Sequence, residues 1–224
     1  GGLNAAFAIM AALYARARTG EGDFIDVALL DSIMPLMGWV AANLLIGGAA
    51  PVPIGNDNFT AAPSGTFRTQ DGHINIAANK QEQWESVCDV LGVPDLKTDP
   101  RFQKRDVRKR HRHDLTPLLE ARLVERPTAE WVDRLNAADV PSGAILPLKA
   151  ALTQPQVRHR GVLQPVDVEG IGRLELFGLT ALFEKHSGTI TAPPPRLGAH
   201  TDEVLDGIGV TADELQALRA SGVV

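Results

Sequence analysis

The spacing of apolar residues predicts a helix at the start of the chain, followed by a strand. Apolar side chains recur at helical spacing over residues 3–17, and Gly20 just beyond is typical of a helix C-terminus. Residues 23–30, "DFIDVALL", alternate enough to predict a short strand. Asp31 is expected to cap the apolar helix that follows.

The next stretch is apolar but interrupted. Residues 32–55 contain no charged side chain, yet proline and glycine leave too little continuous helix to span a membrane. We therefore expect a helix buried between other elements of a soluble protein. Residues 47–63, rich in glycine, proline and asparagine, predict a long loop, and loops of that length are often functional.

The middle of the chain predicts a hairpin followed by helices. "GTFRTQDGHINIAA" has alternating apolar positions around Asp71-Gly72, which predicts a turn with positive φ. Amphipathic helices are expected around residues 81–91, 107–124 and 128–138, the last with Thr128 as a capped start. Residues 140–148, "VPSGAILPL", predict a buried strand with a turn.

The last third alternates short elements. One or two short helices are expected over residues 150–161, strands around the Gly170 and Gly172 turns, and two closing helices over 201–205 and 211–219. The order suggests three parts, which are residues 1–62, 63–146 and 147–224. The middle part has the character of a small domain inserted into a larger one.

Composition limits the function classes. The 224 residues are 44% hydrophobic and 22% charged, which is ordinary for a soluble globular protein. The net charge of -5 argues against a nucleic-acid partner, because nucleic-acid-binding proteins usually carry a basic face. The single cysteine, Cys88, excludes an internal disulfide and suggests a reducing, cytoplasmic setting.

Self-sufficient catalytic motifs are absent from the sequence. It contains no G-x-S-x-G elbow, Walker loop, H-E-x-x-H or C-x-x-C pair. Cys88 falls on an apolar helix face, so we interpret it as a buried structural thiol. His111 and His113 would point to different sides of a helix, and no metal site is expected. The basic run at residues 101–112 is interpreted as a solvated helix face rather than a phosphate site.

The long loop is the strongest local candidate for a site. Residues 53–65, "PIGNDNFTAAPSG", combine flexible glycines with the amides of Asn56 and Asn58. Such a loop can offer N–H groups to a developing oxyanion. It could equally be a plain surface connection, and the residues alone leave both readings open.

Four stretches in order resemble one known family, the class III CoA-transferases, also called CaiB/BaiF. They are "AIMAALYARARTGEGDFIDVALLDS", "IGNDNFTAAPSGTFRTQDGHINIAANKQEQWESVCDVLGVPDLKTDPRF", "TAEWVDRLNAADVPSGAI" and "PRLGAHTDEVLDGIG". The resemblance implies a mixed α/β fold, with a Rossmann-like large domain, partial here, and an inserted small α+β domain. It also implies an intertwined homodimer at full length, with an acyl-CoA and a carboxylic acid as partners and no membrane association.

The resemblance also places a site. Family members attack an acyl-CoA thioester with an aspartate, giving an aspartyl anhydride and then an aspartyl-CoA thioester, with no covalently bound cofactor. That aspartate would lie just before Gly1, so this chain alone is expected to be inactive. Leu29 matches a position lining the CoA channel. The loop with Gly55, Asn56, Asn58 and Pro63 matches the mobile loop over the active site.

One departure from the family pattern and two other hypotheses keep alternatives open. The loop here replaces a run of glycines found in formyl-CoA transferases, which argues against an oxalate or formate substrate. An acyl-CoA racemase of the same superfamily is the alternative enzyme, and its discriminating histidine would lie before Gly1. A third hypothesis is an inert chain that acts only in subunit association.

Overall fold

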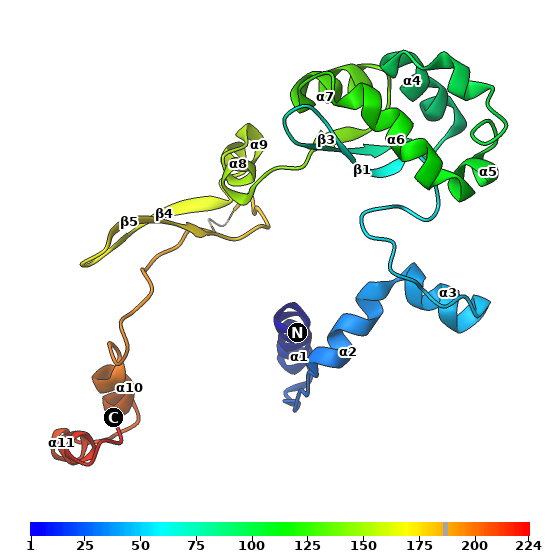
Figure 1. Ribbon diagram of the computed structural model, residues 1–224. Coiled ribbons are helices and arrows are strands. Elements are labelled where there is room, and N and C mark those ends of the chain that lie inside the picture. Colours follow the sequence, from blue (N-terminus) through cyan, green and yellow to red (C-terminus); the bar gives the residue numbers. More distant parts are fainter. Residues whose placement is uncertain (186–187) are drawn as a thin grey trace. The chain divides into compact units, whose positions relative to one another are not determined.

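The computed structural model describes residues 1–185 and 188–224 (Figure 1). It contains two compact units, residues 1–144 and residues 145–224. The three-part division expected from the sequence stays a prediction.

A three-stranded antiparallel sheet forms the centre of the first unit. Its strands are β1 (Ser64–Arg68), β2 (His73–Ala77) and β3 (Ser142–Ala144), in the order β1-β2-β3. On β2, Ile74 and Ile76 are fully buried, whereas the side chains between them face outward. This alternation buries one face of the sheet and confirms the predicted hairpin.

Three helices cover the buried face of the sheet (Figure 1). They are α4 (Gln81–Leu91), α6 (Arg112–Leu123) and α7 (Thr128–Ala137). Helix α6 packs on β1, α7 packs on β2 and β3, and α4 contacts both helices. The helical side chains in this core are Trp84, Val87, Cys88, Leu91, Leu115, Leu119, Leu123, Trp131 and Leu135. Their apolar spacing was readable in the sequence, and the predictions for α4 and α7 are confirmed.

The hairpin turn differs from the prediction. Neither Asp71 nor Gly72 has a positive φ, and four residues separate the two strands. Asp71 instead accepts hydrogen bonds from the backbone N–H and the hydroxyl of Thr128, at 2.8 and 2.7 Å. Thr128 lies inside the first turn of α7, so the hairpin rather than Thr128 caps that helix.

The helix expected over residues 107–124 is broken. Helix α5 (Arg105–Arg110) ends at His111, which leaves helical geometry with φ -98° and ψ 20°, and α6 begins at the next residue. A short 3-10 helix, η2 (Pro94–Lys97), precedes them. Over residues 140–148 only β3 pairs, and its residues are partly exposed because it is an edge strand; Val140 is buried instead.

The helices within the first 47 residues lie outside this core. Helix α1 (Gly2–Thr19) ends at Gly20 in the left-handed region, as predicted. Helix α2 (Leu29–Ile33), the 3-10 helix η1 (Met34–Met37) and α3 (Trp39–Gly47) follow.

The strand predicted over residues 23–30 is wrong for this structure. No described strand lies beside that stretch, and an extended segment without a hydrogen-bonded neighbour forms no ladder. Asp31 does not cap the helix that follows. It lies within the first turn of α2, whose N-cap is Ala28.

The prediction of a buried apolar helix is also wrong. Leu36, Leu45 and Ile46 expose 78%, 82% and 89% of their surface, because no described element packs against them. Within residues 1–185 and 188–224, no single helix is long and apolar enough to cross a membrane. The pair Leu29–Met37 and Trp39–Gly47, bent by 79°, meets those criteria only when joined.

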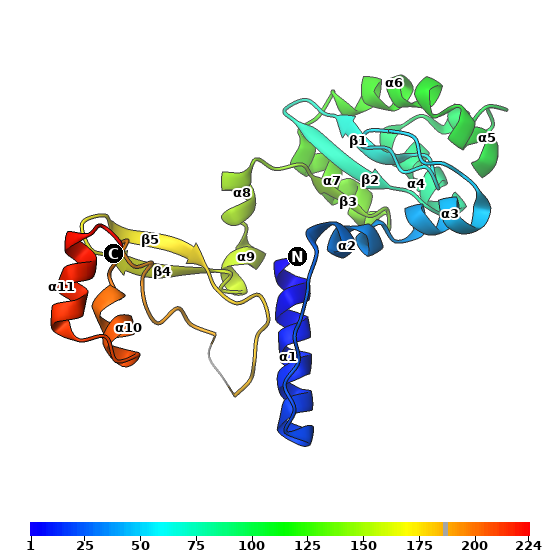
Figure 2. The same cartoon turned by 90° about the horizontal axis from the view of Figure 1, so that it is seen from below.

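The second unit is built on one antiparallel hairpin (Figure 2). Strands β4 (Leu163–Val168) and β5 (Gly172–Phe177) pair from Leu163↔Phe177 to Val168↔Gly172. Helices α8 (Leu148–Leu152) and α9 (Pro155–His159) precede the hairpin. Helices α10 (Thr201–Gly207) and α11 (Ala212–Ala220) close the chain, which confirms the predicted order of elements.

Two neighbouring leucines on α6 test the core. Leu119 is fully buried, whereas Leu118 is 39% exposed. We expect Leu119→Ala to lower the free energy of unfolding by about 2–5 kcal/mol, through lost burial and a residual cavity. Leu118→Ala should change it by about 0.5 kcal/mol. Urea unfolding followed by tryptophan fluorescence measures both, and equal losses would contradict this packing.

The contact between Asp71 and Thr128 makes stability depend on pH. Hydrogen bonds from the Thr128 backbone and then its hydroxyl lower the pKa of Asp71. A lowered folded-state pKa adds stability that is complete above the ordinary carboxyl pKa of about 4 and is lost as pH falls through the lowered value. Asp71→Asn should flatten this acid dependence in unfolding midpoints measured from pH 7 to pH 2. Asp133→Asn, an exposed carboxylate on α7, should leave the dependence in place.

Candidate functional site

Leu29 lies where the starts of α1 and α2 meet. A Cβ atom added to Gly1 would lie 2.2 Å from Leu29 Cδ2, so the first residue of the chain is in close contact with this side chain. Leu29 opens α2 and is 76% exposed. The N-cap of α1 is Gly1, which has no capping side chain, and the first turn of α1 contains no acidic residue. The amide groups at the start of α1 are therefore not satisfied by α1's own side chains.

The long loop after α3 is built in two halves, which meet at Gly55 (φ 62°). The first half, residues 49–54, lines an apolar pocket of about 370 Å³ together with α3. Trp39 of α3 and Phe59 of the second half also line it, with ring centroids 4.6 Å apart and planes 29° from parallel. Asn43 is the one polar side chain in the lining among the described residues.

The second half of the loop is fastened by its own backbone. The N–H of Asn58 donates to Ser64 O at 2.9 Å, and Pro63 O accepts from the N–H of Ala78 at 3.0 Å. The side-chain oxygen of Asn58 accepts from the N–H and the hydroxyl of Thr60, at 2.9 and 2.7 Å. The segment that the resemblance matches to a mobile loop is thus held closely to the start of β1.

Glycine is required where this segment meets the sheet. A Cβ atom on Gly65 would lie 2.9 Å from Asp57 Oδ1 and 3.1 Å from Asn56 O. Gly65 also has φ 154°, at the edge of the region that side chains disfavour. Residues 56 and 57 therefore lie directly against β1.

The basic run is a solvated face only in part: Arg101, Lys104 and Arg110 are exposed, whereas three of its arginines bind the loop. Arg108 is 1% exposed and donates to Ala62 O and Phe102 O, both at 2.6 Å. Arg112 donates to Asn58 O at 2.8 Å, and Arg105 to Thr60 O at 3.1 Å. These guanidinium groups are occupied with the loop backbone, so they are not available as a phosphate site.

Hydrogen bonds within the chain reduce the number of loop N–H groups that could stabilise an oxyanion. The N–H groups of Asp57, Asn58 and Thr60 already donate within the chain, to Ile54 O, Ser64 O and Asn58 Oδ1. A donor pair would have to come from the remaining N–H groups of residues 55–62. The plain alternative, a surface connection, does not describe the second half either, because residues 61–63 are buried.

The other titratable candidates are structural. Cys88 is fully buried, and burial raises the pKa of its thiol to about 12, which leaves it protonated and unreactive at neutral pH. His111 pairs with Asp114 at 2.9 Å. Over residues 1–185 and 188–224, no group of three or more His, Cys, Asp or Glu side chains is placed to hold a metal ion.

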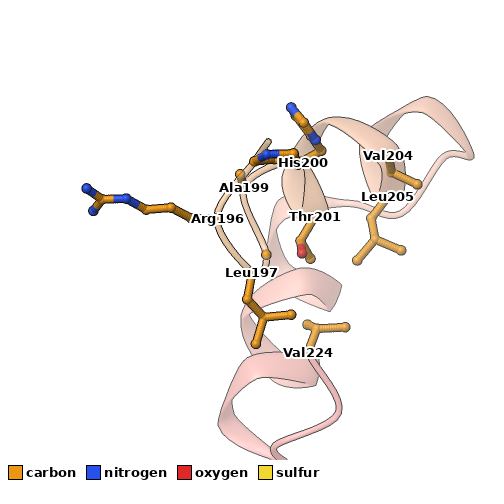
Figure 3. Close-up of a pocket in the computed structure, with 10 residues that line it drawn as sticks. Arg196, Leu197, Ala199, His200, Thr201, Val204, Leu205 and Val224 are labelled. Atoms are coloured by element: carbon orange, nitrogen blue, oxygen red, sulfur yellow. The ribbon is translucent and has the colours of Figure 1, made fainter. Parts of the chain in front are cut away.

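A second hollow lies in the second unit (Figure 3). Leu197, Thr201 and Val224 lie around it, whereas the Arg196 side chain extends away from it. Its lining is mainly apolar, and its titratable groups are Arg196 and His200.

The structure thus brings together four of the five residues expected at a site. Gly55, Asn56, Asn58 and Pro63 share one loop, while no hydrogen bond, ion pair or ring stacking among the described residues joins Leu29 to it. The sequence analysis missed the three arginines that hold the loop. Their spacing of three and four residues, which in one continuous helix would place them on one face, was the available signal.

Comparison with known proteins agrees with this fold. Residues 1–201 match the family model described as CoA-transferase family III. The chain is 34% identical over 225 residues to succinyl-CoA:glutarate CoA-transferase of Mus musculus, covering 100% of this chain and 51% of that protein. It is 38% identical over 160 residues to acetyl-CoA:oxalate CoA-transferase of Acetobacter aceti, covering 69% and 40%.

Solved structures give the same assignment. The fold matches a CaiB/BaiF family protein from Brucella suis with a TM-score of 0.80 and 29% identity, over 92% of this chain and 53% of that chain. A second match is Rv3272 from M. tuberculosis, with a TM-score of 0.73 and 28% identity over 87% and 51%. The chain spans about half the length of the curated relatives it matches. The mixed α/β fold and the family resemblance are confirmed, and the chain belongs to CoA-transferase family III.

Proposed function

We propose that the chain is part of an acyl-CoA:carboxylate CoA-transferase that works through an aspartyl anhydride and an aspartyl-CoA thioester. The contact between Gly1 and Leu29 is the observation that carries this proposal. The resemblance assigns the nucleophilic aspartate to the position just before Gly1 and the CoA channel to Leu29. The contact between Gly1 and Leu29 supports this assignment, because a nucleophile and a thioester channel must be adjacent.

The start of α1 suits an anionic nucleophile. The peptide dipoles of a helix concentrate partial positive charge at its N-terminus, and an 18-residue helix such as α1 has the full effect. An aspartate beside Gly1 would be favoured in its ionised, nucleophilic form. The same amides would stabilise negative charge that develops on a carbonyl oxygen during attack.

The proposed reaction proceeds in balanced steps. The aspartate carboxylate attacks the thioester carbonyl, the C–S bond breaks, and CoA leaves as a thiolate, which gives a mixed anhydride. The thiolate attacks the aspartyl carbonyl of the anhydride and releases the donor carboxylate. The acceptor carboxylate then attacks the aspartyl-CoA thioester and displaces the thiolate. Finally, the thiolate takes the acceptor acyl group and the aspartate is regenerated.

Residues of this chain would surround the reacting groups in those steps. Leu29 offers an apolar wall beside the nucleophile position, and the loop of residues 55–63 covers the reacting groups and limits access of water. Relatives act on succinyl-CoA, acetyl-CoA, glutarate and oxalate. We propose an acyl-CoA donor and a carboxylic acid acceptor for this protein, acting as a cytoplasmic homodimer at full length.

Trapping the covalent intermediate tests the proposed function. The full-length enzyme, incubated with succinyl-CoA, should gain the mass of CoA in a thioester that hydroxylamine removes. Replacing the aspartate before Gly1 with asparagine should abolish both the adduct and transfer to glutarate, because the amide is not a nucleophile. The 224-residue chain alone should show neither.

Three outcomes would contradict it. A CoA adduct on the 224-residue chain would place the nucleophile elsewhere. Exchange of the acyl-CoA α-hydrogen in deuterated water without CoA transfer would favour the racemase. Absence of both reactions in the full-length enzyme would favour a protein that acts only in association.

The association hypothesis has its own observation. Leu3 and Phe7 on α1 and Leu45 and Ile46 on α3 are mostly exposed, and exposed apolar side chains on several neighbouring turns are typical of interaction sites. We expect the 224-residue chain to bind a hydrophobic dye or to self-associate, and Leu36→Gln with Leu45→Gln to reduce both. Leu197→Gln, an exposed leucine of the second unit, is the control. A compact, dye-silent monomer in solution scattering would contradict this expectation.

A further inference from the structure

Three arginines of α5 and α6 bind an irregular loop segment, residues 58–62, through its carbonyl groups. Arg112 donates to the carbonyl oxygen of residue 58, Arg105 to that of residue 60, and Arg108 to that of residue 62. The segment turns at residues 59–60 and bends at 62–63, so its carbonyls are reached from two helices, by Arg105 and Arg108 of α5 and by Arg112 at the start of α6. We call these three residues the arginine clamp.

The clamp binds mainly the backbone of the loop, and Arg112 also pairs with the Asp57 carboxylate at 3.9 Å. Its acceptors are main-chain oxygens, at 2.8, 3.1 and 2.6 Å for Arg112, Arg105 and Arg108. The loop side chains between them are therefore free to contact other groups. Phe59, which lies between two clamped carbonyls, stacks on Trp39 and lines the apolar pocket.

Arg108 anchors the clamp in the core. Its guanidinium lies over the ring of Trp84, 4.8 Å from the centroid, and also donates to Gln81 Oε1 at 3.2 Å. Burial lowers the pKa of Arg108 to about 10, so it keeps its charge at neutral pH. Withdrawing Ala62 O would leave a buried charged donor without an acceptor, which is costly. The loop end is thereby tied to the stability of the core.

The clamp confines movement to the other half of the loop. Residues 56 and 57 are held against Gly65, where no side chain fits, and residues 58–62 are held by the clamp. Residues 49–54 are bonded only at their ends, where the N–H of Ala49 donates to Asn43 O and Ile54 O accepts from the N–H of Asp57, and they lie between two glycines with positive φ, Gly48 and Gly55. These are the positions that can absorb a backbone rotation.

We propose that Arg108 and Arg112 are positioning residues for CoA transfer, which hold residues 58–62 rigid so that Phe59 is presented to the Trp39 pocket. This rests on the proposed function, in which this loop covers the reacting groups. Small displacements of groups that orient a substrate slow catalysis strongly. The clamp would act on kcat through the loop, without touching substrate.

The test compares Arg112→Gln with Arg110→Gln. Both remove one positive charge from the same basic run, but Arg110 makes no hydrogen bond or ion pair within residues 1–185 and 188–224. We expect hydrogen exchange in a peptide spanning residues 56–63 to become about tenfold faster in Arg112→Gln and to stay unchanged in Arg110→Gln. A peptide from α6, residues 113–123, should exchange at the wild-type rate in both.

Steady-state kinetics of CoA transfer is the second measurement. In the full-length enzyme, Arg112→Gln should lower kcat about ten- to a hundredfold with little change in the KM for acyl-CoA. Arg110→Gln should match the wild type. Arg108→Lys, which keeps the charge but has fewer donors, should fall between the two, and Arg112→Gln suffices if that variant does not fold.

The outcomes separate the two proposals. Equal exchange of residues 56–63 in both Gln variants would overturn the clamp itself. Faster exchange with unchanged kcat would overturn its role in catalysis. If the wild-type enzyme transfers no CoA to any carboxylate, the proposed function fails, and the positioning role fails with it, while the exchange rates still report whether the arginines hold the loop.

Discussion

The buried guanidinium of Arg108 is the interaction on which the arrangement of the first unit depends. It joins three segments that are distant in sequence, because it binds the carbonyl groups of Ala62 and Phe102 and lies over Trp84. A buried cation without a carboxylate partner is costly unless its N–H groups are satisfied, and here main-chain and amide oxygens satisfy them. The carbonyl dipoles of the loop and of the turn before α5 thus stabilise the positive charge of Arg108 in place of a carboxylate. Packing on Trp84 adds the favourable contact of a cation with an aromatic face.

This arrangement explains how an irregular loop can have one conformation. Loops usually gain order from their own side chains or from neighbouring strands, and this one gains it from a helix through backbone contacts. Gly65 adds a steric requirement, since residues 56 and 57 come too close to β1 for any Cβ atom there. The half of the loop nearer to α3 lacks both constraints. The loop therefore has a rigid half beside a less constrained one.

The helices before the loop expose apolar side chains instead of burying them. Their apolar side chains are spaced for burial, yet α1 has no buried residue, and residues such as Leu45 and Ile46 are exposed. The hydrophobic effect makes such surfaces favourable to cover, and the relatives are about twice as long as the region matched. The same reasoning applies to residues 23–28, whose extended backbone has polar groups suited to pairing with a neighbouring strand.

Local chemistry in the sequence determined the regular elements of this protein. Periodicity placed α1, α4, α7 and the closing helices, and alternation placed the strands of both hairpins, because these signals depend on which side chains face the same core. Family motifs likewise indicated the loop of Gly55 to Pro63 as a candidate site, which stays a prediction. Only the tertiary structure decided how that loop is held. The basic run has the composition of a solvated face, and the burial of Arg108 depends on carbonyl groups of residues 62 and 102, which no local pattern brings together. The strand at residues 23–30 and the burial of the α3 region failed for the converse reason. Each requires a second surface to pack or pair against. A sequence pattern indicates that an element is suited to burial, but it does not show whether such a surface is present.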